Sequence, residues 1–137
     1  MALDVTTIYN EKLTKGNLII WDYHGGPNQH FYFRRVFPNL NYFYIINAST
    51  GFVIEVPYSE TQDIPLEMMP IDPNFNPNLG RSSQIWEIKT CGKDLFTITS
   101  FCGKCIDVSN DWIRNGTKAI QFTYRNGQNQ KWRIWPS

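Results

Sequence analysis

Two short sequence blocks occur three times along this chain, in the same order and at nearly constant spacing. The first is an aliphatic, acidic, valine tripeptide, which occurs as Leu3–Val5, Ile54–Val56 and Ile106–Val108. The second is Gln-x-aromatic, which occurs as Gln29–Phe31, Gln84–Trp86 and Gln130–Trp132. The acidic residues of the first block are 51 and 52 positions apart. This recurrence predicts one domain of three similar repeats, at about 1–38, 39–90 and 91–137.

Within each repeat the local patterns predict short β-strands. The strand-like stretches mix β-branched and aromatic residues with polar ones: YFYIINAST, FVIEV, LFTITS, AIQFTY and KWRIW. Turn-forming residues separate them at His24–Pro27, Pro73–Gly80 and Asn126–Gly127. No window keeps an apolar period of about 3.6 residues over the length of a helix. We therefore expect an all-β domain, with about four short strands per repeat closed around a pseudo-threefold axis.

Composition narrows the possible functions. A formal charge of +1 gives no field that would attract phosphates or anionic lipid, so we do not expect nucleic acid as a partner. No stretch approaches the roughly 18 apolar residues of a membrane-spanning helix, so we expect no membrane insertion. The N-terminus has no basic and apolar signal pattern, and three cysteines are too few for a disulfide framework. A cytoplasmic location and secretion after signal removal both stay open.

The repeated motifs resemble those of the ricin-B-type β-trefoil lectins, whose repeats carry Gln-x-Trp and an upstream Ile/Leu-Asp-Val. Essentially the whole chain takes part, and the stretch from Cys105 to Trp132 is the most similar. The resemblance implies a β-trefoil that binds glycans or glycoproteins without catalysis. The chain departs from the family in two places. Asp4 is only the fourth residue, so we expect the first repeat to lack most of its opening strand, and Tyr124 stands where many members carry the cysteine partner of Cys105.

A sugar site needs an aromatic platform, a carboxylate that accepts hydrogen bonds from hydroxyls, and amides that fix orientation. The first repeat carries this set as Asp4, Trp21, His24, Asn28 and Gln29. The third repeat carries it as Asp107, Phe122, Arg125, Asn129 and Gln130, with the same seven-residue step from the aromatic to the Asn. The resemblance thus implies two carbohydrate sites, with galactose or N-acetylgalactosamine as the first candidate sugars.

The middle repeat departs from this set, since Glu55 replaces Asp, Ser83 replaces Asn, and the stretch 66–69 has no aromatic. We expect its site to be degenerate. That this repeat keeps Gln84 and Trp86 favours a structural role for the Gln-x-aromatic motif, in which the ring fills the core and the amide binds turn backbone. Turn capping remains the alternative role for the two Asp residues, and core packing the alternative for Trp21.

No nucleophile with an activating base and no phosphate-binding loop is visible, so we expect neither an enzyme nor a cofactor. Cys102 and Cys105 have the spacing of a zinc-ligand pair, but no second pair accompanies them, and we predict no metal site. Two alternatives to a free-standing lectin stay open. One is a protein-interaction scaffold such as a protease inhibitor, for which the Pro-rich stretch 65–77 would supply contacts; the other is the sugar-targeting module of a larger toxin or glycosidase. A homodimer is equally open.

Overall fold

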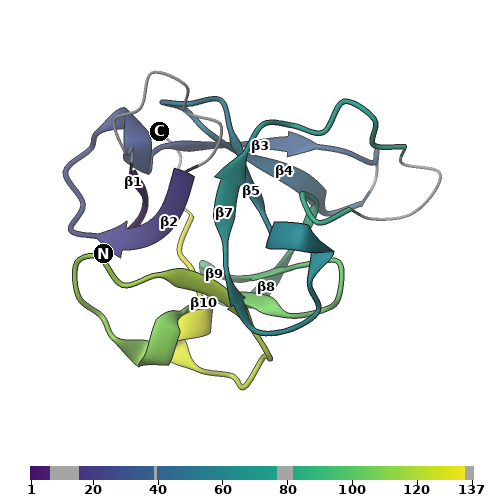
Figure 1. Cartoon of the computed structure of the whole chain (residues 1–137). Helices are drawn as coiled ribbons and strands as arrows, with labels where there is room; N and C mark the ends of the chain where they lie inside the picture. Colours follow the sequence, from purple (N-terminus) through teal and green to yellow (C-terminus); the bar gives the residue numbers. More distant parts are fainter. Residues whose placement is uncertain (7–15, 39, 77–81, 135–137) are drawn as a thin grey trace.

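The computed structural model describes residues 1–6, 16–38, 40–76 and 82–134, and only the backbone for residues 4–6. Within these ranges the regular structure consists of β-strands and single 3-10 turns, which confirms the expected all-β class (Figure 1). No helix in the described ranges is long and apolar enough to cross a membrane.

The strands follow one another in three groups along the chain. The first group is β1 (Ala2–Thr6), β2 (Gly16–Trp21) and β3 (Phe31–Arg35). The second is β4 (Tyr42–Asn47), β5 (Val53–Glu55), β6 (Ile64–Pro65), β7 (Glu67–Met69) and β8 (Trp86–Gly92). The third is β9 (Leu95–Thr99), β10 (Cys105–Val108) and β11 (Ala119–Phe122), with an isolated bridge at Trp132. The 3-10 turns are η1 (Pro27–Gln29), η2 (Pro57–Ser59), η4 (Ser109–Asp111) and η5 (Gln128–Gln130).

An antiparallel strand pair at the centre of each group places the acidic residue of the first block in the same register. The corresponding register pairs are Ala2–Trp21 and Asp4–Ile19, Val53–Met69 and Glu55–Glu67, and Cys105–Phe122 and Asp107–Ile120. In each pair, the last residue of the second strand lies opposite a residue of the first strand. The acidic residue stands two positions after that residue. The repeat seen in the sequence is thus also a repeat of backbone geometry.

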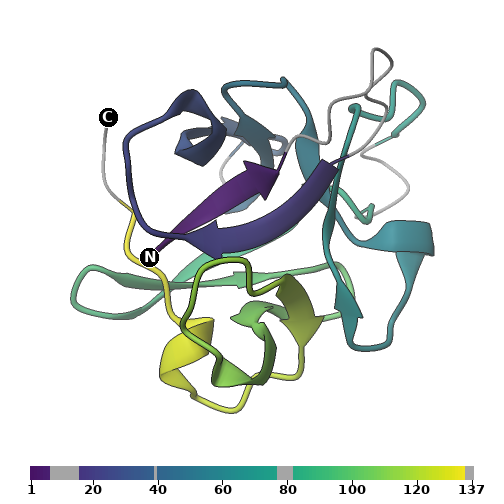
Figure 2. The same cartoon turned by 60° about the vertical axis from the view of Figure 1, so that its left-hand side comes forward.

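The three strand pairs are joined to one another. β2 pairs with β7, β6 pairs with β11, and an isolated bridge joins Ile19 to Lys118 at the start of β11. Figure 2 shows the pair from the third repeat, in green, directly beneath the β1–β2 pair in purple. The remaining strands form a second layer, in which β3 pairs with β4, β4 with β8, and β8 with β9.

The second layer is incomplete on the side of the first repeat. The middle repeat contributes an opening strand, β4, and a closing strand, β8, whereas the first contributes only the closing strand β3 among the described residues. The stretch KWRIW, expected to be a strand, forms only a bridge from Trp132 to Phe96, and Trp135 lies outside the described residues. Its described part has a strand neighbour on one side only, so few ladder hydrogen bonds hold it extended.

The core fills the space between the two layers. Its centre is Trp86, which is fully buried and donates its indole N–H to the Ile54 carbonyl at 2.9 Å. Trp132 makes the equivalent bond to the Ile106 carbonyl at 3.0 Å. The buried residues around them are Leu18, Ile45, Ile54, Val56, Leu66, Met68, Ile98, Ile106 and Ala119.

The Pro-rich stretch 65–77 is only in part a loop. Residues 67–69 form β7, and the following segment packs Ile71 and Phe75 against a second small cluster that contains Tyr44 and Ile85. Pro77 lies outside the described residues. The described part of this insertion therefore covers apolar side chains of the middle repeat, which reduces the surface that it offers to a partner.

Candidate functional site

The glutamine of each Gln-x-aromatic motif is buried and holds the loop that precedes it. Its Oε1 accepts a hydrogen bond from one loop N–H, and its Nε2 donates to the carbonyl two residues earlier. The partners are His24 N and Asp22 O for Gln29, Asp72 N and Pro70 O for Gln84, and Arg125 N and Thr123 O for Gln130, all at 2.8–2.9 Å. Gln29 and Gln130, which the sequence placed among the sugar contacts, are buried and hold these loops; a sugar contact for either stays a prediction.

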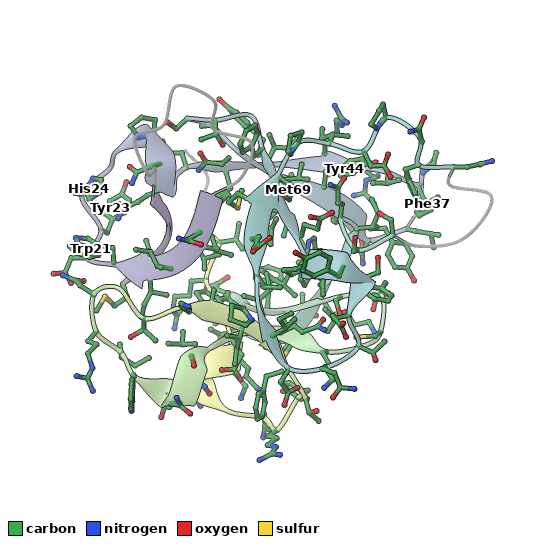
Figure 3. The ribbon with its side chains drawn as sticks, viewed as in Figure 1. Trp21, Tyr23, His24, Phe37, Tyr44 and Met69 are labelled. Carbon is green, nitrogen blue, oxygen red and sulfur yellow. The ribbon has the colours of Figure 1, made fainter. Side chains whose placement is uncertain are left out.

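These glutamine contacts identify the equivalent positions of the three loops. Trp21, Met69 and Phe122 each end the second strand of the central pair and occupy the platform position. Met69 supplies no ring there, in agreement with the absence of an aromatic from this part of the sequence. Figure 3 shows Met69 on β7, apart from Trp21 at the end of β2.

In the third repeat the structure brings Asp107, Asn129 and Gln130 together. Asn129 Nδ2 donates to one carboxylate oxygen of Asp107 at 2.9 Å, and Gln130 Nε2 donates to the other at 2.7 Å. The carboxylate is therefore fixed in orientation from two sides, and Asp107 itself is buried, with only 4% of its surface exposed. Burial raises the pKa of Asp107 above its ordinary value of 3.8, although the hydrogen bonds from Gln130 and Asn129 act in the opposite direction.

Asn129 is held against the backbone of the preceding turn. Its Nδ2 also donates to the Val108 carbonyl at 3.1 Å, which uses both N–H groups. Its Oδ1 would lie 2.5 Å from a Cβ atom placed on Gly127. The first repeat shows the same close approach, since a Cβ on Gly26 would lie 2.7 Å from Asn28 Oδ1. A glycine before each 3-10 turn therefore gives the site Asn its room.

The substitution Gly127→Ala is expected to weaken sugar binding at the third site by about tenfold while leaving the first site unchanged. The new methyl group must displace Asn129, and the loss of its bond to a carboxylate costs about 1.5–3 kcal/mol. Calorimetric titration of a variant that lacks the first site measures this loss. Gly92→Ala is the matched control, because its added Cβ meets Leu95 at an ordinary 3.6 Å. Equal affinities of the two variants would contradict the role of Asn129.

Phe122 and Arg125, the other two predicted residues of the third site, lie next to each other. The Arg125 guanidinium lies 5.0 Å from the centroid of the half-buried Phe122 ring, at cation–π distance. The ring supplies apolar surface next to the strand that carries Asp107. The guanidinium offers several N–H donors beside that surface, whereas His24, at the equivalent position of the first repeat, has at most two ring N–H groups.

The first repeat presents its set more openly. Trp21 is 41% exposed, which favours a surface role over core packing, and His24 is exposed with its Nδ1 accepting the Gly26 N–H at 3.1 Å. The side chain of Asp4 lies outside the described residues, but its backbone has the register of Asp107. Figure 3 shows Trp21, Tyr23 and His24 at one corner of the molecule, at the end of β2 and on the loop that follows it.

Neighbouring contacts hold this loop against the third repeat. Asn115 Oδ1 accepts the Asp22 N–H at 2.8 Å, and Asn115 Nδ2 donates to the Asp22 carboxylate at 3.1 Å. The backbone of Ile20 also bonds to Thr117 and Gly116. The platform of the first site is therefore positioned by residues nearly a hundred positions away in sequence.

Sequence reasoning missed one pair of aromatic residues. Tyr23 is 67% exposed and Tyr124 is 42% exposed, and each stands six positions before the motif glutamine. The Tyr124 hydroxyl donates to Asn126 at 3.0 Å. At the equivalent place of the middle repeat, Ile71 packs into the small cluster instead. The shared offset from Gln29 and Gln130 was the signal that would have found the two tyrosines.

The remaining polar groups do not form a metal centre within the described residues. No group of three or more His, Cys, Asp or Glu side chains gathers there, and the three cysteines are free thiols. Cys105 lies opposite Phe122 rather than Tyr124, and burial raises its pKa to about 12, with Asp107 as a second cause. This thiol stays protonated and unreactive at neutral pH.

In the middle repeat Gln84 Nε2 donates to Glu55 at 3.3 Å, so the acidic group keeps its place beside the motif glutamine. Burial raises the pKa of Glu55, in the same direction as for Asp107. The platform and the amide of the other two repeats are replaced by Met69 and Ser83. Degeneracy of this site remains a prediction.

Comparison with known proteins gives matches at the level of structure. No protein-family model and no curated protein matches the sequence. The designed threefold-symmetric protein ThreeFoil matches with a TM-score of 0.76 and 25% identity over 86% of this chain and 79% of its own. An exo-β-1,3-galactanase from Clostridium thermocellum matches with a TM-score of 0.79 and 26% identity over 96% of this chain and 26% of its own.

A lectin from Polyporus squamosus, bound to the epitope Neu5Acα2-6Galβ1-4GlcNAc, matches with a TM-score of 0.69 and 18% identity, over 95% of this chain and 42% of its own. The chain thus spans about a quarter of the galactanase chain and less than half of the lectin chain. Together with the three repeats of strand pairing, these likenesses show that the chain has the β-trefoil fold. Its structural neighbours include sugar-binding lectins.

Proposed function

We propose that this protein is a non-catalytic, lectin-like β-trefoil that binds carbohydrate at two sites, in the first and third repeats. The observation that carries the proposal is the Asp107 carboxylate, which Asn129 and Gln130 orient on β10, the strand that pairs with the strand of Phe122. The same register, the same glutamine contacts and an exposed aromatic recur around Asp4. A structural neighbour crystallised with a sialylated galactoside supports this class of ligand.

The chemistry of such a site follows from its residues. Two neighbouring sugar hydroxyls would donate to the oriented carboxylate, and charge-assisted bonds of this type are about twice as strong as neutral ones. The C–H face of the pyranose would lie on the aromatic ring, and Arg125 or His24 would contact an outer hydroxyl. Galactose and N-acetylgalactosamine are the first ligands to test, because their axial hydroxyl leaves a continuous C–H face on the other side of the ring.

A glycan array screen of the purified chain, followed by titration of the best ligand, tests the proposal. Binding at the first site should change the tryptophan fluorescence, because Trp21 is the exposed platform there. In Trp21→Phe this change should disappear while the third site still binds by calorimetry. A folded chain that binds no glycan would instead favour a protein-interaction scaffold.

Sugar binding at the third site is expected to weaken as the pH falls toward acid, with a midpoint above 3.8. The bound hydroxyls require the ionised carboxylate, and burial raises the pKa of Asp107 in the folded protein. A raised folded-state pKa also means that protonation of this group favours the native state, so it does not by itself drive unfolding. Titration of Asp4→Ala at several pH values, with circular dichroism in parallel, measures this. A binding midpoint at or below 3.8 would contradict it.

The chain also fits the role of a targeting module within a larger protein. It spans 26% of the galactanase chain and 15% of a mosquitocidal holotoxin, which it matches with a TM-score of 0.78 and 14% identity. In such a setting two weak sites on one domain would act together on clustered glycans and raise the overall affinity. A targeting module of this kind would bind sugar through the same residues as a free-standing lectin.

A further inference from the structure

The closing strand of the first repeat, β3, presents an open edge. It pairs with β4, and no strand among the described residues lies on its other side. The Val36 N–H donates to the Tyr42 carbonyl. In this register the backbone groups of the even-numbered residues of β3 form the hydrogen bonds to β4. Backbone groups of an antiparallel strand alternate in direction, so the N–H and C=O of Phe31 and Phe33 point to the open edge.

The other two repeats show which kind of residue pairs with the aromatic of the Gln-x-aromatic motif. Trp132 exchanges two backbone hydrogen bonds with Phe96, at 2.8 and 2.9 Å, and Trp86 pairs with Phe43 in the middle repeat. Phe31 is the third member of this set, because it has the same place in the Gln-x-aromatic motif. Its outward N–H and C=O therefore match a partner strand that carries an aromatic residue at the position of Phe43 and Phe96.

A groove lies at this place. It has a volume of about 640 Å³, and its apolar lining is Phe33, Phe43, Ile88, Phe96 and Ile134. Phe33, Ile88 and Ile134 each stand two residues after the aromatic of their motif. The groove is thus the space that a third opening strand would fill. An open strand edge beside an apolar groove is the arrangement by which proteins capture an extended peptide.

We propose that this groove binds an extended segment of another polypeptide, which adds to β3 as an antiparallel strand. Because this segment takes the place of an opening strand, we expect its side chains to resemble those of the chain's own two opening strands. These are YFYIIN at 42–47 and LFTITS at 95–100. Both carry Phe at the second position, which lines the groove, and Ile at the fourth, which is buried as Ile45 and Ile98. The partner segment therefore has Phe and Ile at alternate positions, with small or uncharged residues between them.

A fluorescent peptide of the sequence DLFTITS, copied from Asp94–Ser100, tests this by anisotropy with the full chain. We expect saturable binding of the peptide. A second peptide with Ser in place of Phe and Ile, and a third with N-methylated backbone nitrogens toward β3, should each bind at least about tenfold more weakly. Equal binding of the three peptides, or no binding of the first, would overturn the proposal.

Protein variants locate the contact. Phe33→Ser should weaken peptide binding by about tenfold or more, because Phe33 lines the groove. Tyr32→Ser is the matched control, since Tyr32 is 62% exposed and points to the opposite face of β3, and it should bind as the unchanged protein does. A chain that dimerises through β3 and excludes the peptide would assign the groove to a second copy and overturn the proposal.

Discussion

Trp86→Ala is expected to lower the free energy of unfolding by about 3–5 kcal/mol. The ring is fully buried at the centre of the core, so its loss removes apolar contacts and leaves a cavity. It also removes the indole donor from the Ile54 carbonyl. Urea denaturation measures the change, and the melting temperature should fall by more than about 8 °C for a chain of this length.

The control for this substitution is Trp112→Ala. Trp112 is 54% exposed, and its ring contacts the Arg114 guanidinium at the surface. Its removal should change the free energy of unfolding by no more than about 0.5 kcal/mol. Similar losses for the two variants would contradict the assignment of Trp86 to the centre of the core.

The combined substitution Asp4→Ala and Asp107→Ala is expected to reduce glycan affinity by more than about 100-fold. Each carboxylate is proposed to accept two hydroxyl bonds, and bonds to charged groups are worth about 1.5–3 kcal/mol each. Each single variant should lose one of two binding events in calorimetry. Because Asn129 and Gln130 donate to Asp107, its removal also leaves them without this acceptor, at a cost of about 1–3 kcal/mol in stability.

Glu55→Ala provides the matched control. Glu55 has the register of Asp4 and Asp107, but it lies in the repeat where Met69 replaces the platform. If that site is degenerate, glycan binding should stay unchanged, and the measured stoichiometry should be the same as for the unaltered chain. Unchanged binding in the Asp4 and Asp107 double variant would show that the two sites are wrongly assigned.

Much of the fold follows from local sequence. The alternation of polar with β-branched and aromatic residues predicted the strands, and the repeated motif predicted three equivalent units. The structural role expected for Gln84 and Trp86 agrees with their burial, and it was predictable because the middle repeat keeps both residues although its Asp and Asn positions differ. Features that depend on a local sequence pattern could therefore be predicted from the sequence.

Other features depend on which segments meet in space. Ile71 and Phe75 belong to a Pro-rich stretch, and only packing against Tyr44 shows that they cover a small apolar cluster. The loop that carries Tyr23 is held by Asn115, which belongs to another repeat. Contacts between distant segments leave no periodic signal in the sequence, so composition and spacing did not reveal them.

The sequence by itself thus determined the β-trefoil class, the repeat and the residue types of two candidate sugar sites. Only the tertiary structure decided how Asp107 is oriented, which aromatic rings reach the surface, and that, within the described part of the chain, β3 has a strand neighbour on one side only. The physical reason is that strand propensity and side-chain chemistry are local properties, whereas register, burial and the pairing of strand edges are set by the whole chain.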